Sequence, residues 1–93
     1  MILRQIIILL AIVIPLGIQA QKQASVVVDA ASGEPLAKAS VFDRRGNFIG
    51  LTSTSGRMPL VEDESYPIVI RYLGYEPKTV KRPGTTRIRM SEN

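Results

Sequence analysis

The stretch DAASGEPLAKASVFD, Asp29–Asp43, decides the fold of this chain, because it sets a turn between two runs of small and β-branched residues. Gly33 can adopt a positive φ at no steric cost, while Pro35 fixes its own φ and pushes Glu34 toward extended geometry. Leu36 is then the first apolar side chain available to a core, and the alanines around it leave room for close packing. The stretch therefore predicts a connector between two strands.

The chain beyond its first twenty residues is a series of short apolar runs separated by glycine- and proline-containing turns. We expect strands at Val26–Val28, Ala39–Phe42, Asn47–Thr52, Arg57–Leu60, Pro67–Leu73, Lys78–Lys81 and Thr86–Met90. In the last strand Ile88 and Met90 alternate with Arg87 and Arg89, which predicts an apolar pair facing inward and two arginines in water. Runs of this kind predict an all-β fold, a small antiparallel β-sandwich of about seven short strands, with a small open barrel as the alternative.

The first twenty residues have the layout of a secretory signal peptide. Arg4 precedes an uninterrupted apolar run over Ile6–Ile14, and the segment ends on a small residue, Ala20. The apolar stretch is shorter than the roughly 20 residues of a membrane-spanning helix, which argues against the alternative of a retained anchor. We expect a helical signal peptide over 1–20, cleaved after Ala20, and one exported domain over 21–93 in the periplasm or at the outer membrane or cell surface.

The composition excludes most catalytic chemistry. The chain has 93 residues, of which 45% are hydrophobic, so it can hold one small core. It contains no His and no Cys, so the usual general base, the usual thiol nucleophile and any disulfide are absent. We therefore expect no enzyme activity, no catalytic residue and no cofactor-binding or metal site.

Two carboxylate features bear on that expectation. The acidic run Glu62–Glu64 offers oxygen ligands of the kind that divalent cations bind. A solvated turn between strands explains the same run more simply, and we favour that interpretation. Glu34 is likewise expected to be an exposed turn residue rather than a catalytic acid.

Three segments carry a resemblance to a known family. SGEPLAKASVFD, GLTSTSGRMPL and IRYLGYEP, at 32–43, 50–60 and 70–77, resemble in order the three signatures of the carboxypeptidase regulatory-like domain, also called the carboxypeptidase-D regulatory-like or peptidase-associated domain. The resemblance covers about Gln23 to Met90. It implies a transthyretin-like (prealbumin-like) sandwich, non-catalytic in itself, of the kind found in exported Bacteroidetes proteins and often at the N-terminus of TonB-dependent receptors.

The chain departs from that family pattern in the second segment. Ser53 stands where the family usually has Asp, and Met58 followed by Pro59 stands where it usually has Phe. Ser53 can still bond to the turn backbone, more weakly than Asp. Pro59 cannot donate to a strand ladder, so the strand at 57–60 should be short or lie at an edge.

The aromatic residues of the third segment are expected to be structural. Tyr72 and Leu73 should end a buried strand, and Gly74 should supply the turn that follows it. Tyr75 should then fold back with its ring on the core and its hydroxyl bonded to a backbone group.

The basic residues gather late in the chain. From residue 71 onward they are Arg71, Lys78, Lys81, Arg82, Arg87 and Arg89, against Glu76 and Glu92. A nucleic-acid surface would add stacking aromatic side chains along the groove, and export makes nucleic acid a poor partner. These side chains are expected to face water, where their charge could also favour peripheral contact with an anionic membrane surface.

Two functions of different classes follow. The first is an exported, non-catalytic accessory or interaction module of the bacterial cell envelope, associated with an envelope protein such as a TonB-dependent outer-membrane receptor. The second is a stand-alone carbohydrate- or peptide-binding protein of the periplasm or cell surface that uses strand edges or loops. The chain ends soon after the last expected strand, which leaves open a one-domain product or the front module of a longer protein. The sequence does not indicate an oligomeric state.

Overall fold

Six short strands and one turn of 3-10 helix make up the regular structure of residues 25–93, the part of the chain that the computed structural model describes. The elements are β1 (Val26–Asp29), β2 (Ser40–Phe42), β3 (Phe48–Leu51), η1 (Asp63–Ser65), β4 (Ile68–Arg71), β5 (Lys78–Val80) and β6 (Arg87–Met90). The prediction of an all-β domain is confirmed. The segment 1–20 assigned to a signal peptide lies outside the described residues.

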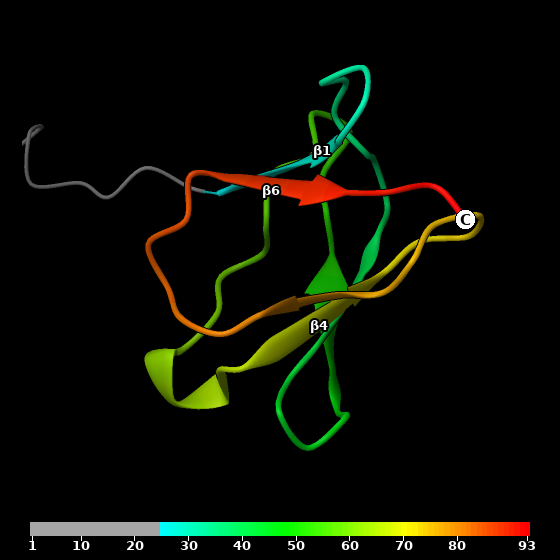
Figure 1. The fold of residues 1–93 in the computed structure, drawn as a ribbon. Helices are drawn as coiled ribbons and strands as arrows, with labels where there is room; N and C mark the ends of the chain where they lie inside the picture. The colour runs from blue at the N-terminus through cyan, green and yellow to red at the C-terminus, as the bar shows by residue number, and fades with distance from the viewer. Residues whose placement is uncertain (1–24) are drawn as a thin grey trace, which may run out of the picture.

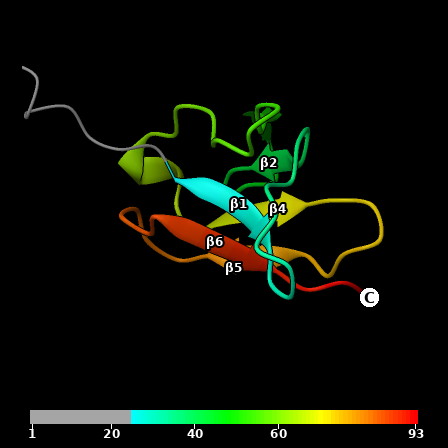
Figure 2. The ribbon, with the colours of Figure 1, turned by 90° about the horizontal axis from the view of Figure 1, so that it is seen from above.

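The strands form two sheets that face each other as layers (Figure 1). One sheet has four strands in the order β3-β2-β4-β5, with antiparallel pairing throughout, and the other has two strands, β1 and β6. Seen from above, β6 lies over β5 and β1 lies over β4 (Figure 2). This arrangement is compatible with the small β-sandwich that the sequence predicted.

The pairing of β1 with β6 corrects one part of that prediction. The two strands run parallel, with Val26 opposite Arg87 and Asp29 opposite Met90, whereas an entirely antiparallel sandwich was expected. Short strands at close spacing with turn signals between them favour antiparallel pairing. Here the connection after β5 carries the chain from one layer to the other, so β6 pairs with the strand at the other end of the domain.

The expected strand at Arg57–Leu60 does not form, so within the described residues there are six strands instead of seven. Arg57 makes a single antiparallel bridge with Val26, and the Met58 N–H donates to the carbonyl of Ser25 at 2.9 Å. Pro59 has no N–H to continue this ladder, which is the physical reason that pairing stops.

The core lies between the layers and draws on every strand except β3. It consists of Val27, Leu36, Ala39, Val41, Ile68, Ile70, Val80, Ile88 and Met90. Ile88 and Met90 are buried, whereas Arg87 and Arg89 beside them are exposed, as the alternation in sequence predicted. Burial of each of the larger side chains stabilises the fold by about 1.5–3 kcal/mol.

The opening connector folds back along the edge of β1. Gly33 has a φ of 77° and donates its N–H to the Asp29 carbonyl at 2.8 Å. The Asp29 N–H donates to Glu34 O, and the Leu36 N–H donates to Val27 O. The connector therefore covers the edge of β1 that β6 leaves free, and the predicted burial of Leu36 is confirmed.

Thr52 ties the end of β3 to this connector through a buried hydroxyl. The side-chain Oγ1 donates to the carbonyl of Leu36 at 2.6 Å and accepts the N–H of Ala39 at 2.9 Å. A buried hydroxyl is costly unless it is hydrogen-bonded, and here it is bonded twice. Within residues 25–93, every buried side-chain nitrogen or oxygen has a partner.

The end of β4 differs from the prediction. The strand stops at Arg71, and the Leu73 side chain is 99% exposed, although it was expected to end a buried strand. The chain turns at this point, with the Tyr75 N–H donating to Tyr72 O at 3.0 Å and Gly74 at a φ of 87°. The tip of this turn carries Leu73 away from the core.

Replacement of Gly56 by alanine tests the packing of the second segment against β1. Gly56 has a φ of +79°, and an added Cβ would lie 2.7 Å from Val27 O and 2.9 Å from the Cβ of Pro35. We expect Gly56→Ala to lower the free energy of unfolding by about 1–3 kcal/mol through overpacking, beyond about 1 kcal/mol for the positive φ. Chemical denaturation measures the loss.

Gly46→Ala is the matched control for this substitution. Gly46 has a φ of +85° with nothing within 4 Å of an added Cβ. Its replacement by alanine should therefore lower the free energy of unfolding only through the unfavourable positive φ. Equal losses for the two variants would contradict the close approach at Gly56.

Candidate functional site

A carboxylate and a phenol join the two layers at one end of the domain. Asp29, the last residue of β1, is 6% exposed, and its Oδ2 accepts the Tyr75 hydroxyl at 2.5 Å. Its Oδ1 accepts the backbone N–H groups of Ala31 at 2.8 Å and Ser32 at 2.9 Å. One side chain therefore holds both the turn after β1 and the connection between β4 and β5.

The predicted packing of the Tyr75 ring against the core is confirmed, whereas the predicted backbone acceptor for its hydroxyl is wrong. The ring packs against the core beside Tyr72, with the two ring centroids 5.4 Å apart. The hydroxyl donates to the carboxylate of Asp29 and not to a backbone group. No sequence signal points to this pair, because the two residues are 46 positions apart and meet only through the stacking of the layers.

This contact shifts the acidity of both partners in opposite directions. The hydrogen bond from Tyr75, together with those from the backbone of Ser32 and Ala31, lowers the pKa of Asp29 below its ordinary value. The hydrogen bond to Asp29 and, after it, burial raise the pKa of Tyr75 from 10.0 to about 12. The geometry fixes a charged acceptor and a neutral donor at neutral pH, which is the state of a structural link.

The segments at 32–43, 50–60 and 70–77 each make contacts that join parts of the fold. Gly56 of the second segment packs against Pro35 of the first, and Tyr75 of the third bonds to the strand that precedes the first. Ser53 accepts the N–H groups of Ser55 at 3.3 Å and Arg57 at 3.1 Å, which confirms the predicted local bonding of this turn. Each of these groups is thus engaged in holding the fold.

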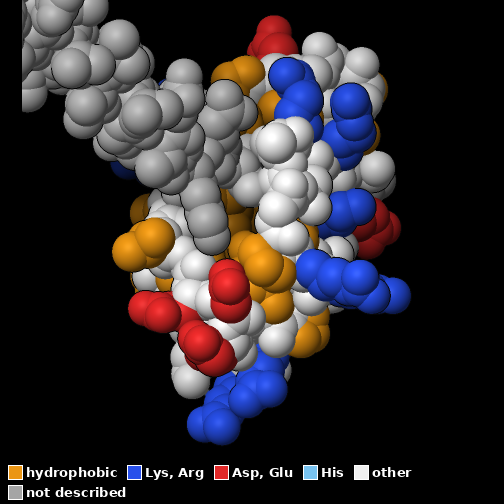
Figure 3. Space-filling view, turned by 90° about the vertical axis from the view of Figure 1, so that its left-hand side faces the viewer, with side chains coloured by type: hydrophobic (Ala, Val, Ile, Leu, Met, Phe, Trp, Pro, Cys, Tyr) orange, Lys and Arg blue, Asp and Glu red, His pale blue; other side chains and the backbone are white. Residues whose placement is uncertain are grey.

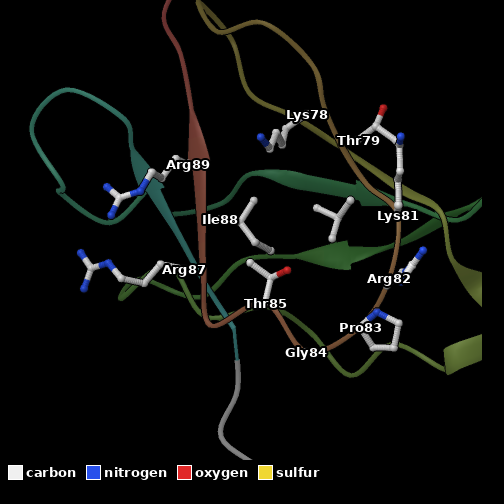
Figure 4. Close-up of a pocket in the computed structure, with 11 residues that line it drawn as sticks. Lys78, Thr79, Lys81, Arg82, Pro83, Gly84, Thr85, Arg87, Ile88 and Arg89 are labelled. Atoms are coloured by element: carbon white, nitrogen blue, oxygen red, sulfur yellow. The ribbon is translucent and has the colours of Figure 1, made fainter.

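Five of the late basic residues line one groove, although the side chains of Arg87 and Arg89 extend from β6 on the side away from Ile88 (Figure 4). The groove has a volume of about 680 Å³ and lies between β5, β6 and the connection that joins them. Its basic lining residues are Lys78, Lys81, Arg82, Arg87 and Arg89. Among the described residues, none that lines the groove carries a carboxylate, so the lining has a net positive charge that would attract negatively charged groups.

Arg71 does not belong to this group, although the sequence placed it in the same cluster. It lines a separate hollow with Tyr72, Leu73 and Tyr75. Strand β4 lies inside its sheet between β2 and β5, whereas the groove lies beyond the edge of β5. Sequence proximity alone therefore overstated the size of the basic cluster.

The acidic residues of the run at 62–64 do not line the basic groove. Glu62, Asp63 and Glu64 are exposed at and beside η1, as the interpretation of a solvated turn predicted, and Glu34 is exposed as well. Within residues 25–93, no group of three or more acidic side chains is arranged to hold a metal ion. Figure 3 shows a row of Lys and Arg side chains on one flank of a face and a group of acidic side chains across an apolar patch from it.

In the part of the chain that the structure describes, no helix is long and apolar enough to cross a membrane. In comparisons with known proteins, no family model matches the chain, and no curated protein matches it.

Tyr75→Phe tests the link between the layers through its ionisation. The wild-type chain should show a tyrosine that ionises near pH 12 in an absorbance titration, and the variant should lack it. Because the folded state holds the Tyr75 proton more tightly than the unfolded state, this contribution to stability is complete below pH 10 and is lost between about pH 10 and 12. Tyr72→Phe should keep the late ionisation, and its loss there instead would refute the assignment.

Asp29→Asn tests the same link from the acidic side. The lowered pKa of Asp29 means that its charge stabilises the folded state above the unfolded value of 3.8, and that this stabilisation is lost as the pH falls through the folded pKa. The variant should be less stable than the wild type at neutral pH, and the difference should shrink below about pH 3.8 in thermal unfolding. Glu34→Gln, at an exposed carboxylate, serves as the control. A difference that does not change with pH would refute this role.

Proposed function

We propose that this protein is an exported, non-catalytic accessory module of the bacterial cell envelope that acts by binding another envelope protein. The observation that carries the proposal is the use of three ordered sequence segments as joints of one two-layer β domain. Those segments hold the fold, and we assign partner binding to the basic groove between β5 and β6.

We further propose that the domain is of the carboxypeptidase regulatory-like kind and has a transthyretin-like sandwich. The support is the order of the segments at 32–43, 50–60 and 70–77 together with an all-β fold in two sheets. Each segment then has its own role in the fold. The first covers the edge of β1, and the second packs closely against β1 and Pro35 at Gly56. The third supplies Tyr75, whose hydroxyl bonds to Asp29 of β1.

A non-enzymatic role is supported by the chemistry of the side chains. The chain has no His and no Cys to supply a general base, a thiol nucleophile or a soft metal ligand. Its most perturbed pair, Asp29 and Tyr75, is engaged with neighbouring groups in the fold. Association with a TonB-dependent outer-membrane receptor would fit the export signal and the resemblance.

A second candidate is a stand-alone binding protein of the periplasm or cell surface for carbohydrate or peptide. The groove of about 680 Å³ favours it, because a single domain could bind a ligand there without a larger protein. The described residues that line the groove include no aromatic side chain, which argues for peptide over neutral sugar, since sugar rings commonly pack on aromatic faces.

The experiment that tests export and partner binding starts from the producing cell. The intact mass of the product in the envelope fraction should match a chain that begins at Gln21, because cleavage after Ala20 removes the signal segment. Crosslinking in intact cells should then recover an envelope protein bound to the domain.

Three outcomes separate the candidates. A cytoplasmic product with an intact N-terminus would overturn export. An exported product that crosslinks to no envelope protein but binds a peptide or glycan with saturation would favour the stand-alone binding protein. A larger product that contains this chain would indicate that the domain is the N-terminal module of a longer protein such as a receptor.

A further inference from the structure

We propose that the free edge of β6 binds an extended acidic peptide segment of a partner protein, which adds to the two-stranded sheet as a third strand. The inference rests on the proposed function, because it names the site and the chemistry by which an interaction module would hold its partner. Three features of this part of the molecule support it, namely an open backbone edge, an apolar floor and a flank of cations.

The backbone of β6 leaves alternate groups open. The Val26 N–H donates to Thr86 O at 2.9 Å, and the Ala30 N–H donates to Met90 O at 2.8 Å. Peptide groups in a strand alternate in direction. The backbone N–H and C=O groups of Ile88 and Met90 therefore point to β1, and those of Arg87 and Arg89 point to the other edge of β6. Within residues 25–93, no hydrogen bond between strands occupies that edge.

The same edge is paired one step further along the chain. The Glu76 N–H donates to Ser91 O at 2.8 Å, and the Asn93 N–H donates to Gly74 O at 2.9 Å. The residues after β6 therefore begin a ladder with the segment before β5. The ladder stops where β5 and β6 separate into different layers, so an unsatisfied edge remains beside the groove.

The floor and flanks of the groove define what could pair there. Ile88 lies between β6 and β5 in Figure 4, and with Val80 it forms an apolar floor. Arg87 and Arg89 extend from the opposite side of β6. A strand added to this edge would place alternate side chains over the apolar floor and the others beside the two arginines, where carboxylates are favoured.

Lys78, Lys81 and Arg82 add positive charge on the β5 side of the groove. The predicted ligand is thus an extended segment in which acidic residues alternate with apolar or small ones. A two-stranded sheet is marginal on its own, so a third strand would also complete the thinner layer of the domain.

Other occupants fit these features less well. A second copy that paired through the same edge would set Arg87 and Arg89 against the same arginines, and like charges directly opposite are destabilising. An acidic glycan or lipid headgroup could bind the cations but has no peptide groups to pair with the backbone of β6. The edge of β1 away from β6 is covered by the connector.

The test uses the isotope-labelled chain and a short synthetic peptide in which Glu alternates with Val or Thr. Titration followed by NMR should give saturable shifts centred on the amides of Arg87 and Arg89. The bound peptide should also slow the hydrogen exchange of these two amides, because they would become donors in a ladder. The same peptide with N-methyl groups on every backbone nitrogen should not bind, because neither of its edges can then donate to β6.

Charge reversal gives the matched pair of variants. Arg87→Glu combined with Arg89→Glu should weaken peptide binding by about tenfold or more, because two attractive cross-strand pairs become repulsive. Arg44→Glu combined with Arg45→Glu changes the net charge equally, but it lies in the exposed turn between β2 and β3 and should leave the affinity within about twofold.

Four results would overturn the inference. Tight binding of the N-methylated peptide, equal loss in both double variants, or shifts confined to side chains with no change in amide exchange would each indicate attraction by charge alone. Binding of a sulfated polysaccharide or of anionic vesicles in preference to the peptide would assign the groove to a different class of ligand.

The outcome is separable from that of the proposed function. If crosslinking recovers the same envelope partner with the wild type and with the Arg87→Glu, Arg89→Glu variant, the module function stands and the site is elsewhere. If neither chain recovers a partner, the module function fails whatever the peptide does in solution.

Discussion

The parallel pairing of β1 with β6 dictates how the chain between them must run. Two parallel strands cannot be joined by a tight turn, so the chain between them must cross to another layer and return. Here that crossover comprises four strands, and they form the whole of the second sheet. The core exists because the crossover presents the apolar faces of β2, β4 and β5 to those of β1 and β6.

Polar contacts at the ends of the layers hold this arrangement in register. Asp29 bonds to its own turn and to Tyr75, so the last residue of β1 is tied to the connection between β4 and β5. Thr52 ties the end of β3 to the connector that covers β1. Both side chains are buried and hydrogen-bonded. A buried polar group that lacked some of these hydrogen bonds would lower the stability of the fold more than an apolar side chain in the same place.

The same architecture leaves the outer edge of β6 without a partner strand among residues 25–93. The smaller sheet ends at β6, whose neighbour in sequence has moved to the other layer, so the peptide groups of Arg87 and Arg89 face a groove rather than a strand. Positive charge on an exposed edge discourages pairing between identical copies. In the proposed complex the same positive charge favours an acidic partner. The charge that limits pairing between copies of this chain would then also help it to recognise another protein.

The parts of this structure that depend on neighbouring residues can be predicted from the sequence alone. The alternation of Ile88 and Met90 with two arginines predicts which face of β6 is buried and which is exposed, because side chains of a strand alternate whatever strand it pairs with. The turn at Gly33 and the local bonds of Ser53 followed from short-range backbone chemistry. The effect of Pro59 was foreseen as well, although pairing there is reduced to one bridge.

Strand pairing, the layer that each strand joins and the contacts between distant side chains depend on the three-dimensional fold and cannot be predicted from local sequence. The parallel direction of β1 and β6, the bond between Asp29 and Tyr75 and the gathering of basic residues without Arg71 all follow from the layer change after β5. Such contacts join residues far apart in the chain, and their free energy depends on burial that no local window contains. The open edge of β6 is of the same kind, because an unpaired strand is defined by neighbours that the fold places elsewhere.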